Sequence, residues 1–145
     1  MQVYYDFLGG MALKGEYIAG TISGAGTSSS NANWNSEFNI NGERKFAGFY
    51  TQFIKNIGIK NQFVARYDSW DPNTKLAGNS VKSKDELKVN TLSVSWIYFF
   101  DDNIKINMGY TLPTNEKSTN SGVGTDYLNR DKRDNTFTLR VQATF

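Results

Sequence analysis

The sequence contains neither cysteine nor histidine. Without cysteine the chain cannot form a disulfide framework, and without either residue it lacks the usual ligands of zinc. Ser–His and Cys–His nucleophile–base pairs are excluded for the same reason. We therefore expect no cofactor, no metal site and no enzyme activity, and a membrane-embedded hydrolase or acyltransferase is the least favoured function.

Long apolar runs are missing as well. No stretch of about 18 apolar residues occurs, which excludes a transmembrane helix. The net charge of +2 is too small and too scattered to predict nucleic-acid binding. The first residues, MQVYYDF, lack the basic and apolar regions of a signal peptide. We expect a mature chain or a segment of a longer gene product.

The dominant pattern that is present is the alternation of apolar and polar residues. It is clearest in the last eleven residues, Asn135 to Phe145, which read NTFTLRVQATF. A period of two over about ten residues predicts a strand with two different faces, long enough to cross a bilayer as part of a barrel wall. The apolar positions of this strand are Phe137, Leu139, Val141, Ala143 and Phe145.

Six further segments show the same alternation, and aromatic residues, at 14% of the chain, favour strands over helices. Leu87 and Val89 are out of phase with the residues that follow them, which predicts a bulge. A short strand or helical turn is also predicted around residues 34–40. The six strands are predicted at Gln2–Leu8, Met11–Gly20, Phe46–Lys55, Asn61–Trp70, Leu87–Phe100 and Ile104–Leu112.

The predicted connections alternate in length. Short connections fall at Gly9–Gly10, 56–60 and 101–103, and long ones fall at 21–45, 71–86 and 113–134. Outer-membrane barrels combine short periplasmic turns with long extracellular loops, whereas soluble sandwiches and lipocalin-like barrels have no reason to alternate. Aromatic residues also gather near both ends of the strands, as in the two girdles of a membrane barrel.

The sequence therefore predicts an all-β fold: an antiparallel transmembrane β-barrel of the outer-membrane type, with residues 1–145 in a single domain. A soluble ligand-binding β-barrel is the alternative. Seven strands is an odd number, and the first and last of seven antiparallel strands cannot pair in antiparallel fashion. We expect the chain to be the C-terminal part of a larger barrel, or to contain an eighth strand within residues 21–45.

Several stretches together resemble a known family. The stretches MALKGEYIAG, GFYTQFIKNIGIKNQFVARYDSWDPNTK, LSVSWIYFFDDNIKINMGY and DNTFTLRVQATF are similar to the C-terminal region of Bacteroidetes porins of the phosphate-selective porin O and P group. The resemblance implies a barrel of roughly sixteen to eighteen strands. It also implies passage of anions or phosphate, and a terminal strand that serves as the signal for the outer-membrane barrel assembly machinery.

The polar faces of the predicted strands supply the candidate residues of a pore wall. Mixed charges on such a wall select solutes weakly by sign and size. We expect pairs within the wall, such as Arg66 with Asp68, because a phosphate site would need several Arg or Lys at one constriction. Asp71 and Asn73 are interpreted as turn formers rather than calcium ligands. The lumen-facing candidates are Lys14, Glu16, Arg66, Asp68, Lys105 and Arg140, with Asp6 as a further acid.

These patterns lead to two functional hypotheses. The first is an outer-membrane porin, a water-filled passive diffusion channel for small polar or anionic solutes, phosphate among them. The second is a non-transporting outer-membrane barrel with a structural or surface-binding role through its long loops. The expected partners are outer-membrane lipid and lipopolysaccharide, the barrel assembly machinery, small solutes and further copies in a homotrimer, but no nucleic acid.

Overall fold

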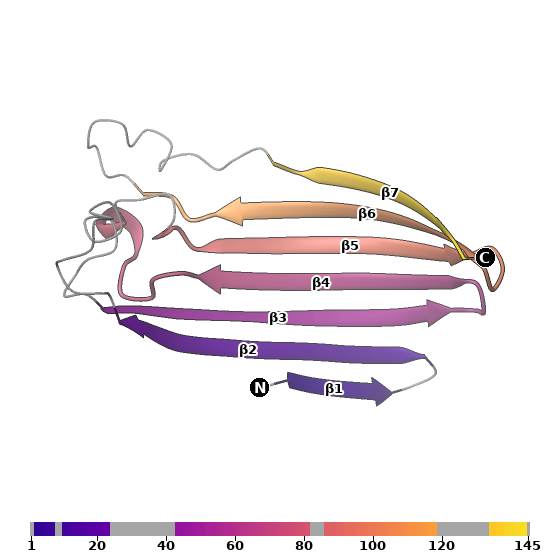
Figure 1. Cartoon of the computed structure of the whole chain (residues 1–145), viewed down its shortest axis with the longest axis horizontal. Helices are drawn as coiled ribbons and strands as arrows, with labels where there is room; N and C mark the ends of the chain where they lie inside the picture. The colour runs from indigo at the N-terminus through magenta and orange to yellow at the C-terminus, as the bar shows by residue number, and fades with distance from the viewer. Residues whose placement is uncertain (1, 8–9, 24–42, 82–85, 119–133, 145) are drawn as a thin grey trace.

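A computed structural model of the chain describes residues 2–7, 10–23, 43–81, 86–118 and 134–144. Seven strands lie side by side in one antiparallel sheet, in the order in which they occur along the chain (Figure 1). They are β1 (Gln2–Phe7), β2 (Met11–Ser23), β3 (Glu43–Ile57), β4 (Asn61–Asp71), β5 (Val89–Phe99), β6 (Ile104–Asn115) and β7 (Thr136–Ala143). The all-β antiparallel prediction is confirmed.

The sheet is a single layer, and successive connections lie alternately at its two ends (Figure 1). Short connections join β1 to β2, β3 to β4 and β5 to β6, as the sequence predicted. Gly10 and Gly58 adopt positive φ angles of 80° and 63° in the first two of these turns, a conformation that favours glycine. In the third, Asp101 Oδ1 accepts hydrogen bonds from the backbone N–H groups of Asn103 and Ile104.

Strand boundaries differ from the prediction mainly at the ends that lead to long connections. β2 continues to Ser23, β3 begins at Glu43 and β6 continues to Asn115, although these terminal residues were assigned to loops. The period-2 signal is weak there because the residues are small or polar. The segment predicted around residues 34–40, the space for an eighth strand at 24–42, and Phe145 lie outside the described residues.

The predicted bulge is wrong. β5 begins at Val89, and it pairs with β4 and β6 in an unbroken register. Leu87 precedes the strand and is buried with Leu76 and Val81. The phase break therefore marks a change from a folded connection to a strand.

The described residues of that connection, between β4 and β5, include the short 3-10 helix η1 (Gly78–Ser80). Glu116, just after β6, accepts hydrogen bonds from the backbone N–H groups of Gly78 at 2.7 Å and Lys88 at 3.4 Å. Ser118 donates to the carbonyl of Val81. Two of the long connections are thus tied together at one end of the sheet.

Buried apolar residues are few in the described part of the chain. They are Ala12 in β2 and the three residues of the β4–β5 connection. Among the described residues, no second layer packs against the sheet to form a core. Within the same residues, no helix is long and apolar enough to cross a membrane.

Candidate functional site

The register of the sheet divides its side chains between two faces. Directly paired residues of antiparallel strands point to the same side, and the side alternates along each strand. Leu13 pairs with Phe53, Phe53 with Ala65, and Ala65 with Val94. We call the side that carries these residues the apolar face and the opposite side, which carries Arg66 and Asp68, the polar face.

The apolar face is continuous from β2 to β7 and is largely uncovered. Its exposed large residues include Leu13, Tyr17, Phe49, Phe63, Tyr67, Leu92, Trp96, Tyr110, Phe137, Leu139 and Val141. On β7 the exposure reaches 60% for Leu139 and 65% for Phe137. An apolar patch of this extent marks a surface that contacts lipid or another protein.

Among the side chains that the structure describes, the charged residues of the apolar face are Lys45, Lys55 and Asp71, all near strand ends. Lys45 and Lys55 enclose nine residues of β3, whose apolar-face positions run from Ala47 to Phe53. At roughly 3.3 Å per residue and the strand tilt of about 40° that is usual in barrels, the two lysines would lie about 25 Å apart along a barrel axis. This matches the height of the apolar band of outer-membrane barrels.

Aromatic residues lie in the middle of this band and toward its short-turn end. Phe49 and Tyr67 pack 6.0 Å apart near the middle of β3 and β4, although the sequence placed them nearer the long connections. Near the short turns Trp96 packs 5.9 Å from Tyr98 and donates its indole N–H to Asn61 Oδ1 at 3.0 Å. An indole ring with an apolar body and a satisfied polar edge suits a water–lipid boundary.

All six lumen-facing candidates lie on the polar face. Lys14 and Glu16 come from β2, Arg66 and Asp68 from β4, Lys105 from β6 and Arg140 from β7. They do not form a single cluster: Arg66 and Asp68 pair on β4, and Lys105 and Arg140 line one depression. Asp6 occupies the corresponding register position on β1, opposite Ala12.

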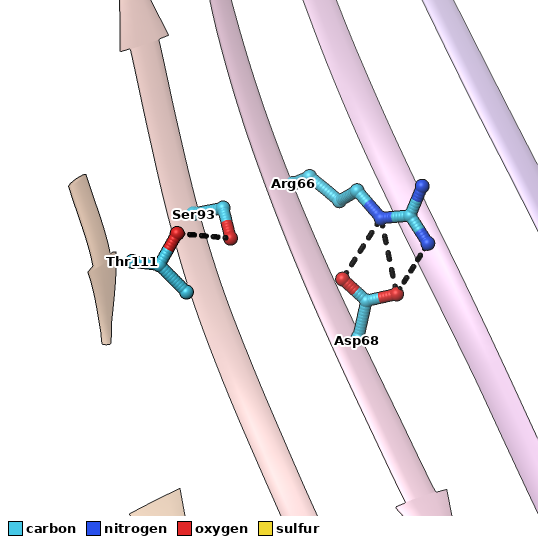
Figure 2. A network of polar contacts seen from close by, with 4 residues as sticks. All are labelled: Arg66, Asp68, Ser93 and Thr111. Carbon is cyan, nitrogen blue, oxygen red and sulfur yellow. Dashed lines mark hydrogen bonds and ion pairs between the residues drawn. The ribbon is translucent and has the colours of Figure 1, made fainter. Parts of the chain in front are cut away.

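Arg66 and Asp68 form the pair that the sequence predicted. The guanidinium Nε lies 2.8 Å from Asp68 Oδ2, and a second nitrogen lies 2.5 Å from Oδ1 (Figure 2). The guanidinium carbon also lies 4.1 Å from the centre of the Tyr50 ring. On the neighbouring strands, Ser93 donates to Thr111 across the β5–β6 pair at 3.4 Å (Figure 2). The centre of the polar face is therefore hydrophilic and locally neutral.

A second group of polar residues lies on β6 and β7 nearer the short turns. Lys105, Asn107, Arg140 and Gln142 line a depression of about 130 Å³ together with Ile97. Among the described residues no carboxylate pairs with Lys105 or Arg140. Asn107 Oδ1 is buried without a hydrogen-bond partner within the same part of the chain. We call these four polar residues the basic depression.

Sequence reasoning missed two features of the polar face. The basic depression depends on cross-strand register, which places Asn107 opposite Arg140 and Lys105 opposite Gln142. Arg44 was assigned to a loop, but it lies in β3, and its Nε donates to the Pro72 carbonyl at 2.5 Å. The alternation of β3, extended by two residues, would have placed Arg44 on the polar face.

Other sequence assignments concern the terminal strand and the turn residues. Phe137, Leu139, Val141 and Ala143 lie together on the apolar face of β7, whereas Phe145 falls outside the described residues. Asp71 Oδ1 accepts a hydrogen bond from the Asn73 N–H, as in an ordinary turn. Within the described residues no group of three or more Asp, Glu, His or Cys side chains is placed to hold a metal ion.

Comparison of the chain with protein-family models, curated proteins and solved structures gave no match. The function must therefore be argued from the geometry of the sheet and the chemistry of its two faces.

Proposed function

We propose that the sheet is part of the wall of an outer-membrane β-barrel, the C-terminal part of a larger porin, whose polar face lines a water-filled passive diffusion channel. The observation that carries this proposal is the single-layer sheet with one uncovered apolar face. In water, that face would have no partner. In a bilayer, lipid would cover it, and the band of about 25 Å between Lys45 and Lys55, which has one charged residue, Asp71, near its edge, has the height that an outer membrane requires.

The polar face supports passage of small polar or anionic solutes. Its central charges are neutralised by the Arg66–Asp68 pair, whereas the basic depression places Lys105 and Arg140 side by side without a paired acid. Two cations attract an anion, and Asn107 Oδ1 is a free acceptor next to them. Hydrogen phosphate has both anionic oxygens and a hydroxyl donor, so it can use both kinds of group.

Planar-bilayer recording of the complete barrel tests this function. We expect discrete conductance steps and, in a tenfold KCl gradient, a zero-current potential that indicates a modest preference for chloride. The double variant Lys105→Gln/Arg140→Gln should lose most of that preference. Lys14→Gln removes one positive charge from the same face outside the depression and serves as the control. A barrel that inserts but carries no current would exclude the channel.

A non-transporting surface-binding barrel is the second candidate, and the folded β4–β5 connection favours it. Its three buried apolar residues and the Glu116 hydrogen bonds give a defined shape at the end of the sheet that carries the long connections. Glu116→Ala should raise amide exchange at Gly78 and Lys88 without changing conductance. In a non-transporting barrel, Glu116→Ala would raise amide exchange in the same way, but the unchanged protein would carry no current.

A further inference from the structure

The polar face contains an aromatic feature that a plain hydrophilic wall does not require. Phe46 of β3 and Trp70 of β4 pack with ring centres 5.5 Å apart, near the ends of the strands that lead to the long connections. Trp70 remains 43% exposed. We call Phe46 and Trp70, with the two glycines beneath them, the aromatic platform.

The glycines determine how the rings lie. Phe46 pairs in register with Gly20, and Trp70 pairs with Gly48. A Cβ atom on Gly20 would lie 2.6 Å from the Phe46 ring, and one on Gly48 would lie 2.6 Å from the Trp70 ring. Real Cβ atoms do not approach other atoms so closely. Both rings therefore occupy space that a side chain on the neighbouring strand would fill. Their positions depend on the absence of a side chain there.

Apolar and charged groups surround the platform on the same face. Ile18 and Ile22 of β2 are about half exposed, at 51% and 49%. On β4, Asp68 and Arg66 lie two and four residues before Trp70, and Tyr50 continues the aromatic series on β3 beneath the Arg66 guanidinium. An aromatic surface thus leads from the end of the sheet to its hydrophilic centre.

We propose that the aromatic platform binds saccharides. A pyranose ring presents polarised C–H groups on one side, which suit the negative face of an aromatic ring, and hydroxyl groups at its rim. Those hydroxyls can donate to Asp68 and accept from Arg66, whose paired arrangement already fixes both groups. The chemistry is that of a site with apolar contact area and a few oriented polar groups.

The local charges favour a neutral ligand over an anion at this position. Arg66 is paired with Asp68, and Arg44 donates to the Pro72 carbonyl. An oxyanion would have to compete with these partners for either guanidinium group. The inference rests on the polar face being open to solutes, as in the proposed function. It adds a ligand class and a position that differ from those of the basic depression.

The test uses the full chain in detergent micelles and maltohexaose as the probe. We expect saturation transfer from aromatic protons to the sugar C–H protons, and weak binding by calorimetry. Trp70→Leu should weaken binding roughly five- to tenfold, the range expected for loss of one aromatic contact. Trp96→Leu removes a tryptophan of similar exposure from the apolar face and should leave binding unchanged.

Trp70→Phe is the control for a folding defect. It retains an aromatic ring over Gly48, so its affinity for maltohexaose should lie within about threefold of that of the unchanged protein. Equal binding by the Trp70→Leu and Trp96→Leu proteins would overturn the inference, as would the absence of saturation transfer in the unchanged chain. Binding does not require conduction. A conducting barrel that ignores maltohexaose contradicts the platform alone, and a closed barrel that binds it contradicts the channel alone.

Discussion

At the scale of single residues, the Arg66–Asp68 pair neutralises two opposite charges on the polar face. The two side chains are 40% and 33% exposed, so the pair contributes at most about 1 kcal/mol to stability. Its larger effect is electrostatic, because each charge cancels the other on the polar face, which in the proposed channel is the path of a solute. Breaking the pair should therefore change the electric field at this face more than the stability of the sheet.

Single and double substitutions of this pair should change ion selectivity in opposite directions. Arg66→Gln leaves Asp68 uncompensated and should shift the zero-current potential toward cation preference, whereas Asp68→Asn should shift it toward anions. The double variant restores neutrality and should return close to the starting value. Shifts of the same sign in both single variants would contradict mutual neutralisation.

Gly48 is a second residue whose role is visible only in three dimensions. A methyl group at this position meets the Trp70 ring at 2.6 Å, whereas one on Gly15 approaches no atom closer than the Tyr50 carbonyl at 3.4 Å. Gly48→Ala should therefore lower the unfolding free energy in micelles by about 1–3 kcal/mol, the usual cost of overpacking. Gly15→Ala is the matched control and should be close to neutral. Equal changes in the unfolding free energy for Gly48→Ala and Gly15→Ala would show that the Trp70 ring can move aside without an energetic cost.

At the scale of elements, the strands could be predicted because each keeps its alternation through its central residues. The ends of the strands could not be predicted. The apolar pattern is interrupted at Thr21–Ser23 and at residues 43–45, although these two segments still pair through their backbones. The Arg66–Asp68 pair was predictable because both residues lie on one strand. The basic depression and the aromatic platform were not, because each joins residues from neighbouring strands through the register.

Strand β7 provides a direct test of the two faces. Leu139 and Thr138 are adjacent and exposed, and they pair with Met108 and Gly109 on opposite sides of the sheet. Leu139→Arg should destabilise the folded state in lipid by about 2–4 kcal/mol, as expected for a charge facing the middle of a bilayer. Thr138→Arg should cost about 1 kcal/mol or less. Urea titration in vesicles measures both, and the reverse ranking would mean that the faces are assigned wrongly.

At the scale of the whole molecule, stability depends on what covers the apolar face. The described residues bury little apolar surface, so in the proposed barrel lipid would supply the environment that a core supplies elsewhere. We expect the yield of protease-protected chain to be higher in vesicles with a hydrocarbon thickness near 25 Å than in those near 32–33 Å, because mismatch costs a fraction of a kcal/mol per Å. An identical yield in both would contradict a lipid-facing band of this height.

The order of the strands has a consequence for how such a wall can change in size. Every strand pairs only with its neighbours along the chain, and each pair joined by a short turn forms a hairpin. Duplicating one hairpin adds two strands while preserving strand direction, the sidedness of both faces and the end at which each connection lies. Enlargement by whole hairpins therefore needs no other rearrangement of the sheet. The gain of a single strand would reverse the direction of every later strand and move every later connection to the opposite end of the sheet.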